Sequence, residues 1–146
     1  DGYYNIMLLG GDDGAGRDSM RFDSISVVSI NAETGQISRT GVPRDLGGFP
    51  FVDGSPMKQL YPDVHTGHPD ATCGWGAGIN QLNTEVTVCG HGKQLYPNAA
   101  AQGSTPGIEA TRDALEGLLG IKIQYYLLMN YGGFAQLVDV RNRRSS

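Results

Sequence analysis

The chain has 146 residues, a mass of 15.6 kDa, 39% hydrophobic residues and a formal net charge of -4. This length and composition exclude intrinsic disorder and predict one domain with a hydrophobic core. No run approaches the roughly 18 apolar residues of a membrane helix. The acidic balance argues against nucleic acid as a partner, because binding to a phosphate backbone needs clustered Lys and Arg.

Glycine is unusually abundant, with 22 residues, about twice the average usage of roughly 7%. Glycine favours turns, so a large share of the fold is predicted to be loops. Binding and catalytic residues are often carried on loops. We therefore expect the function to lie there.

The first part of the chain predicts three strands. Tyr3–Leu9 is a short apolar run that Gly10 and Gly11 end, as in a buried strand before a tight turn. A polar loop follows up to residue 23. β-Branched residues then predict a strand over 24–30, a hairpin turn over 31–35 and a returning strand over 36–42.

The middle of the chain loses this periodicity. From residue 46 to about 78, glycines and prolines interrupt every candidate element, which predicts a long surface loop that forms a lid or rim. A short helix is predicted over 79–88, and a second loose stretch over 90–103.

The last third predicts a helix, a strand and a further helix. Ser104 or Thr105 can cap the first helix, and Gly120 ends it. Residues 121–129 resemble a central strand, and 131–138 the start of another helix. This order predicts an α/β fold, a mixed central sheet with helices on both faces, in a single domain over residues 1–146.

Two cysteines, Cys73 and Cys89, lie in the loose stretches. Their spacing matches neither a zinc knuckle nor a CxxC motif, so a disulfide between them is the simpler hypothesis and implies an oxidising compartment. Two buried free thiols would look the same in the sequence. A zinc site that combines these cysteines with His65, His68 and His91 is less favoured, because the spacings are irregular and a disulfide uses the thiols more simply.

Charged residues gather where the three predicted strands begin or end. They are Asp12 and Asp13 after the first strand, Arg21 and Asp23 before the second, and Arg44 and Asp45 after the third. Carboxylates bind hard cations, and guanidinium groups bind phosphate oxygens, so these loops predict a magnesium site with a phosphorylated ligand. The alternative is that the Asp residues solvate a turn while Arg44 pairs with Asp45 or Glu33. A P-loop is excluded, because neither GxxxxGK[ST] nor GxGxxG occurs.

Several sequence blocks resemble the LytR-CpsA-Psr family, in the order in which that family carries them. They are NIMLLGGD at 5–12, RFDS at 21–24, VSIN at 28–31, VPRD at 42–45, GINQLN at 78–83, and LLGIKIQYY at 118–126 followed by GF and LVD. The resemblance spans most of the chain. The cysteine-bearing segment CGWG at 73–76 is most similar to the actinobacterial members.

This resemblance implies an α/β/α sandwich that transfers a glycopolymer from a polyprenyl-pyrophosphate carrier to peptidoglycan. The polymer would be of the arabinogalactan or teichoic-acid kind. Two alternatives share the same residues: a hydrolase of the lipid pyrophosphate, and a non-catalytic module that binds the carrier or the cell wall.

By matching motifs, the resemblance assigns roles to four charged residues. Asp12 and Asp23 would hold Mg²⁺ or Mn²⁺, and one carboxylate would deprotonate the acceptor hydroxyl. Arg21 and Arg44 would bind the pyrophosphate, and Arg44 is counted with the catalytic groups. The carrier's tail needs an apolar tunnel, for which the candidate lining is Leu8, Val27, Leu115 and Leu127.

The chain departs from the family pattern in two ways. Phe22 and Gly11 replace the usual small or hydroxyl residues beside the two Asp positions. A later family block, rich in Arg, matches only Arg141 and Arg143, which would be further pyrophosphate ligands, so the C-terminal part of the pattern is expected to be missing. The family also implies an extracytoplasmic protein, with its membrane anchor in a preceding segment removed from this chain.

Overall fold

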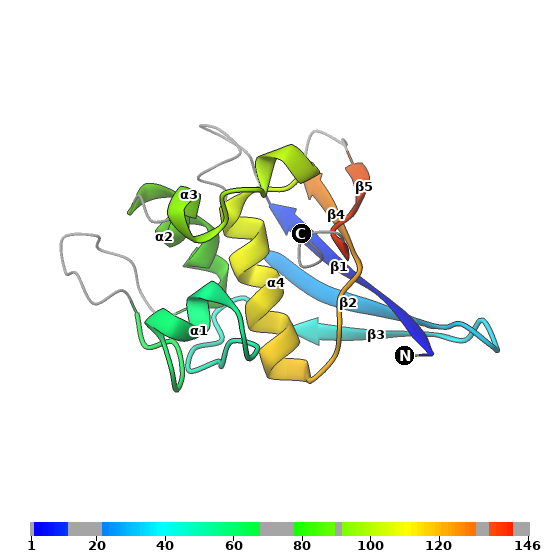
Figure 1. Cartoon of the computed structure of the whole chain (residues 1–146). Helices are drawn as coiled ribbons and strands as arrows, with labels where there is room; N and C mark the ends of the chain where they lie inside the picture. The colour runs from blue at the N-terminus through cyan, green and yellow to red at the C-terminus, as the bar shows by residue number, and fades with distance from the viewer. Residues whose placement is uncertain (1, 12–21, 68–77, 90–91, 131–134, 142–146) are drawn as a thin grey trace.

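A computed structural model describes residues 2–11, 22–67, 78–89, 92–130 and 135–141 (Figure 1). Its strands are β1 (Tyr3–Gly11), β2 (Ser24–Asn31), β3 (Ile37–Val42), β4 (Tyr125–Asn130) and β5 (Ala135–Asp139). Its helices are α1 (Pro56–Leu60), η3 (Ile79–Gln81), α2 (Leu82–Val88), α3 (Gly92–Leu95), η4 (Ala100–Gln102) and α4 (Pro106–Leu119).

The five strands form one mixed sheet in the order β3-β2-β1-β4-β5. β1 pairs with β4 in parallel, and the other neighbours are antiparallel. The hairpin between β2 and β3 turns at Asn31, whose side-chain oxygen accepts the backbone N–H groups of Glu33 and Thr34. Gly35 completes this turn at a φ of 74°. The α/β class and the mixed sheet predicted above are confirmed.

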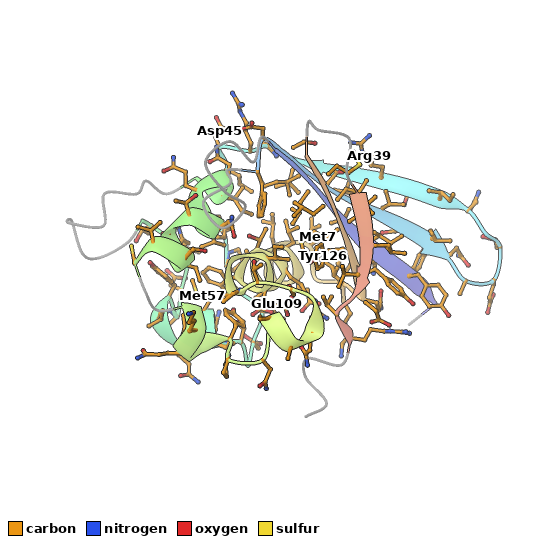
Figure 2. The ribbon with its side chains drawn as sticks, turned by 90° about the horizontal axis from the view of Figure 1, so that it is seen from above. Met7, Arg39, Asp45, Met57, Glu109 and Tyr126 are labelled. Atoms are coloured by element: carbon orange, nitrogen blue, oxygen red, sulfur yellow. The ribbon has the colours of Figure 1, made fainter. Side chains whose placement is uncertain are left out.

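Alternation along the strands decides which residues enter the core. Met7 and Leu9 of β1, with Ile25 and Val27 of β2, are almost fully buried. Figure 2 shows Met7 and Tyr126 pointing toward α4, with Arg39 on the other side of the sheet. The residues that alternate with these buried ones along β1 and β2 face the Arg39 side of the sheet, because successive residues of a strand point to opposite faces.

The described helices all lie on one face of the sheet (Figures 1 and 2). The second helical layer of the predicted sandwich is not found in the described part of the chain. On the other face, Tyr4, Met129 and Leu137 are each about half exposed, and Ile37 is 69% exposed. Within the described residues, the predicted helices are therefore found on one face of the sheet.

The helix α4 is the element that the sequence predicts best. Thr105 caps it by accepting the N–H of Ile108 at 3.2 Å, and Pro106 occupies its first position. Gly120 ends it at a φ of 68°. The short helix predicted over 79–88 is also present, as η3 followed by α2.

The segment from residue 46 to 67 is not the surface loop that was predicted. It contributes Phe49, Phe51 and His65 to the interior, each at most 2% exposed. Its ends are joined by backbone hydrogen bonds from Gly48 N to His65 O at 3.1 Å and from His65 N to Phe49 O at 2.9 Å. The sequence pattern did not predict this core role, because the aromatic rings pack against one another from irregular backbone, without any periodic spacing.

His65 is a structural residue of this interior. Its ring stacks on Phe49 with centroids 4.9 Å apart, and its Nε2 lies 2.9 Å from Glu85 Oε1. Tyr61 donates to Glu85 Oε2 at 2.9 Å. The other predicted members of a zinc site, His68, His91 and Cys73, lie outside the described residues, and the Cys73–Cys89 pairing stays a prediction for that reason.

Residues 121–139 also differ from the prediction. The strand β4 begins at Tyr125 instead of Ile121, because the intervening backbone bonds to α4 and β1. The segment predicted as a helix over 131–138 contains the strand β5 over Ala135–Asp139, which pairs with β4. The pairing with β4 determines that this segment is a strand, because the pattern of its own five residues does not.

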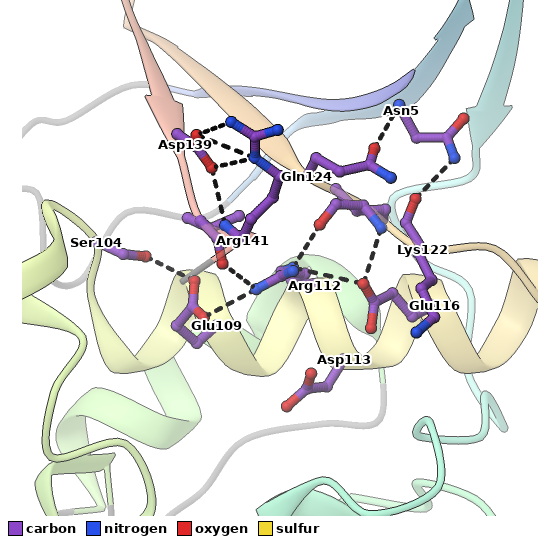
Figure 3. A network of polar contacts seen from close by, with 12 residues as sticks. Asn5, Ser104, Glu109, Arg112, Asp113, Glu116, Lys122, Gln124, Asp139 and Arg141 are labelled. Carbon is purple, nitrogen blue, oxygen red and sulfur yellow. Dashed lines mark hydrogen bonds and ion pairs between the residues drawn. The ribbon is translucent and has the colours of Figure 1, made fainter. Parts of the chain in front are cut away.

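A buried polar network fastens this segment to α4 (Figure 3). Arg112 donates from Nε to the carbonyl of Ile123 and from Nη1 to the carbonyl of Val140, both at 2.8 Å. It also lies 3.4 Å from Glu109 and 3.5 Å from Glu116, and these three side chains are at most 5% exposed. One guanidinium therefore holds the backbone at the two ends of the β4–β5 hairpin.

Among the helices described, none is long and apolar enough to cross a membrane.

Candidate functional site

The candidate site lies at the end of the sheet where β1 and β3 finish and β2 begins. Gly10 of β1 pairs with Ser24 of β2, and Val42 of β3 pairs with Ile25. Asp23 directly precedes β2, and Arg44 follows β3 by two residues. The register alone therefore brings these two charged positions to the same end of the sheet.

Arg44 and Asp23 form an ion pair there. Arg44 Nη1 lies 3.6 Å from Asp23 Oδ1, and the two side chains are 62% and 35% exposed. The partner that the structure gives Arg44 is thus Asp23, and not Asp45 or Glu33 as the alternative had it. A pair this exposed contributes little to stability. Its charges are accessible to a ligand.

Asn80 of η3 makes backbone hydrogen bonds to Arg44 and to the residue before Asp23. Its N–H donates to the carbonyl of Arg44 at 2.9 Å, and its carbonyl accepts from the N–H of Phe22 at 3.3 Å. Phe22 is 1% exposed, so the residue before Asp23 is anchored in the core. Sequence reasoning noted the block around Asn80 but gave it no role, because backbone contacts have no signature in side-chain chemistry.

Close packing brings this third segment against the strand ends. A Cβ atom at Gly78 would lie 3.5 Å from the Cα of Asp45 and 2.9 Å from Asn80 Oδ1. Ile79 donates its N–H to the carbonyl of Leu46 at 2.8 Å and is fully buried. Three segments far apart in the chain thus form one rigid support for Asp23 and Arg44.

An open trough of about 510 Å³ extends from Asp23 along β2 and β3. It is lined by Asp23, Ser24, Ile25, Ser26, Arg39, Gly41, Val42 and Pro43. A second cavity of about 650 Å³ lies between α2, α3 and the start of α4, with Lys93 as its charged lining residue. It contains none of the predicted site residues, so the strand-end trough is the better candidate.

The remaining predicted site residues are not gathered here by the described structure. Asp12, Arg21 and Arg143 lie outside the described residues. Arg141 follows β5 at the opposite end of the sheet, where it pairs with Asp139 and lies 5.1 Å from the Tyr125 ring. We therefore leave Arg141 out of the site.

The described residues do not supply enough ligands to hold a metal ion. Asp23 and Asp45 are carboxylates of this end, and Arg44 already balances the charge of Asp23. No group of three or more His, Cys, Asp or Glu side chains that could hold a metal ion occurs within the described ranges. Asp12 was predicted to provide the second carboxylate, so the metal stays a prediction.

The four residues predicted to line an apolar tunnel do not share one space. Val27 and Leu115 are buried at 1% or less in the core between sheet and α4. Leu8 and Leu127 are paired neighbours on the opposite face of the sheet. Leu8 sits between Met7 and Leu9 in sequence, so the period of two places it on the other side.

Comparisons with known proteins give structural similarity alone. No family model matches the chain, and no curated protein matches it in sequence. A solved structure of the protein gbs0355 from Streptococcus agalactiae matches with a TM-score of 0.50 at 19% identity, over 88% of this chain and 33% of its own. The crystal structure of B. subtilis TagV matches at 0.49 and 18%, over 89% and 37%.

A third structure is described as the LytR-CPS2A-psr family protein YwtF (TagT) with bound octaprenyl pyrophosphate lipid. It matches with a TM-score of 0.47 at 17% identity, over 90% of this chain and 35% of its own. The chain thus spans about a third of the length of these structures. It has the α/β fold of the Streptococcus agalactiae protein, and a LytR-CPS2A-psr family protein is among the structures to which it is similar.

Proposed function

We propose that this chain is a LytR-CpsA-Psr domain that transfers a glycopolymer from a polyprenyl-pyrophosphate carrier to peptidoglycan. The sequence blocks of that family occur here in order. The observation that carries the proposal is the Arg44–Asp23 pair, which the 78–80 segment fixes at one end of the sheet. This pair joins two of those blocks, and Asn80 belongs to a third.

The exposed guanidinium of Arg44 supplies the binding group for the pyrophosphate. Arginine presents a planar set of N–H donors that fits two phosphate oxygens at once. The hydrogen bond from Asn80 N–H to the Arg44 carbonyl fixes the position of the Arg44 backbone, from which the side chain extends. Binding an anion here draws Arg44 away from Asp23, which frees the Asp23 carboxylate for a second task.

That second task is to accept a proton. The acceptor hydroxyl attacks the phosphorus that carries the glycan, and a new phosphorus–oxygen bond forms as the bond to the bridging oxygen breaks. The electron pair leaves with polyprenyl phosphate, and the hydroxyl proton passes to Asp23 or Asp12. Such transfers depend mainly on positioning and on stabilising negative charge. Arg44 serves both needs.

Mg²⁺ or Mn²⁺ is the cofactor that we propose, with Asp12 and Asp23 as its ligands. When bound, it would neutralise charge on the phosphate oxygens. The proposal includes a location on the extracytoplasmic side of a membrane, with an anchor holding the domain there, because lipid-linked glycans and peptidoglycan meet on that side. A Cys73–Cys89 disulfide is consistent with such an oxidising environment.

The test is a transfer assay with a labelled prenyl-pyrophosphoryl glycan, with and without peptidoglycan, at saturating Mg²⁺. We expect label on the peptidoglycan, and a fall of roughly 10²- to 10³-fold in kcat/KM for Arg44→Ala and for Asp23→Asn. Lys93→Ala is the matched control, since Lys93 is an exposed cation away from the trough.

Three outcomes would overturn the proposal. Glycan phosphate released at equal rates with and without acceptor would mark a hydrolase. Tight binding of the lipid without turnover would mark a binding module. Full activity of Arg44→Ala would show that the site lies elsewhere.

A further inference from the structure

The trough beside the Arg44–Asp23 pair continues well beyond the two charged groups. It runs along the open face of β2 and β3 and ends at Arg39. The Arg39 guanidinium is bonded to Ser26, which pairs with Gly41, and Gly41 precedes Arg44 by three residues, roughly 10 Å at the rise of a strand. A ligand group bound by Arg39 is therefore separated by about this distance from a group bound by Arg44.

Two small residues lie in the middle of the trough, and one of them, Ser26, is 2% exposed. Ser26 of β2 pairs with Gly41 of β3 in the middle of it. A Cβ atom at Gly41 would meet nothing within 4 Å, so the space above this position is open. Larger side chains at these two positions would fill the volume that separates Arg39 from Asp23.

Arg39 is a cation of the trough that is separate from the Arg44–Asp23 pair. It is exposed, its Nε donates to Ser26 Oγ at 3.3 Å, and its cross-strand neighbour is Val28. Within the described ranges it has no carboxylate partner, whereas Asp23 is taken by Arg44. The bond to Ser26 fixes the Nε edge of the guanidinium, and its terminal N–H groups can bind a ligand.

We propose that the trough holds the sugar next to the pyrophosphate and that Arg39 selects an anionic substituent on this sugar. The inference rests on the proposed function, because that function places the pyrophosphate at the Arg44 end. The substituent is a carboxylate or a phosphate ester, since the guanidinium fork binds either group with two hydrogen bonds. The substrate class is therefore a glycan whose first sugar is acidic.

A simpler role for Arg39 exists, and the test must separate the two. β3 is an edge strand, and charges on edge strands discourage pairing with other chains. In that role Arg39→Gln would change aggregation and leave ligand selectivity as it was. In the proposed role the selectivity itself depends on the guanidinium.

The experiment measures binding of four compounds by calorimetry. They are farnesyl pyrophosphate and its esters with glucose, glucose 6-phosphate and glucuronic acid. We expect the wild-type protein to bind at least one acidic sugar roughly 10- to 100-fold more tightly than glucose. Whichever of the two acidic compounds binds more tightly identifies the substituent as phosphate or carboxylate.

The variants decide between the roles. Arg39→Gln should lose the preference for the acidic sugar while binding farnesyl pyrophosphate unchanged, and Arg39→Lys should keep part of it. Lys93→Gln, which removes an exposed cation elsewhere, should leave the preference intact. Arg44→Ala should weaken the binding of all four compounds.

Two results would overturn the inference while the proposed function stands: equal binding of the three sugars by the wild type, or a preference that survives Arg39→Gln. If the wild type binds none of the four compounds, or Arg44→Ala binds them all as well as the wild type does, the proposed function fails and the inference fails with it.

Discussion

Arg112 on α4 donates a hydrogen bond of 2.8 Å to the carbonyl of Val140, the residue that follows β5. The same side chain bonds the carbonyl of Ile123, before β4 begins. The last two strands are thus fastened to the main helix by one buried cation, with Glu109 and Glu116 beside it.

The first prediction concerns this cation. Arg112→Met should lower the free energy of unfolding by about 3–5 kcal/mol, because it leaves buried carboxylates without their partner. Urea denaturation followed by circular dichroism measures the loss. Lys122→Met, at an exposed position, is the control and should stay within about 0.5 kcal/mol of the wild type. A small loss for Arg112→Met would mean that the network is not a structural tie.

The second prediction concerns alkaline pH. Burial, helped by the Glu85 carboxylate, raises the pKa of the Tyr61 hydroxyl well above its ordinary value of 10.0. In the unfolded chain this hydroxyl ionises near pH 10, while in the folded protein it stays protonated. The wild type should therefore lose up to about 1.4 kcal/mol of stability per pH unit above pH 10 from this residue.

Tyr61→Phe isolates that contribution. At pH 7 the variant should be less stable by about 1.5–3 kcal/mol, because it removes a hydrogen bond to a buried carboxylate. The gap between variant and wild type should narrow from pH 10 to 12, as followed by urea denaturation. A gap that stays constant over this range would contradict the assignment.

The third prediction concerns the contact between α4 and the segment before α1. A Cβ atom at Gly117 would lie 2.6 Å from Pro50 O and 2.7 Å from Val52 N. Gly117→Ala should therefore destabilise the protein by about 1–3 kcal/mol, although alanine favours helices. Thermal unfolding measures the effect. In Gly41→Ala the new Cβ atom has no neighbour within 4 Å, so the stability should be close to that of the wild type. Equal stability of both variants would refute the close approach at Gly117.

The fourth prediction concerns the far end of the sheet. Hydrogen bonds from the Arg141 guanidinium hold the pKa of the Asp139 carboxyl below its ordinary value of 3.8. This depressed pKa stabilises the fold above about pH 4, and the contribution is lost as pH falls through the folded pKa. NMR titration should show Asp139 moving up toward 3.8 in Arg141→Gln and staying low in Arg39→Gln. An unchanged Asp139 pKa in Arg141→Gln would argue against the pair.

Much of the fold follows from local signals in the sequence. Alternation sets the face of β1, Asn31 and Gly35 set the hairpin, and Thr105 and Gly120 set the limits of α4. Each of these depends on residues within one turn or one strand. Local chemistry is therefore enough to predict them.

Other elements depend on distant partners, and there local patterns were misleading. β5 is a strand because β4 lies beside it. His65 is buried next to Glu85 of α2, and Phe49 stacks on the His65 ring. In the candidate site, the closeness of Arg44 and Asp23 could be predicted from the ends of the strands. The support from Asn80 could not, because it uses the backbone alone.

The central position of β1 has a consequence for how the protein is made. β1 is synthesised well before its parallel partner β4, because the hydrogen bond from Asn5 N to the Gln124 side chain joins residues 119 positions apart. Until β4 arrives, one hydrogen-bonding edge of β1 stays open. Long-range parallel pairing of this kind slows folding and exposes strand edges to aggregation. The nascent chain should therefore depend on chaperones until β4 has been synthesised.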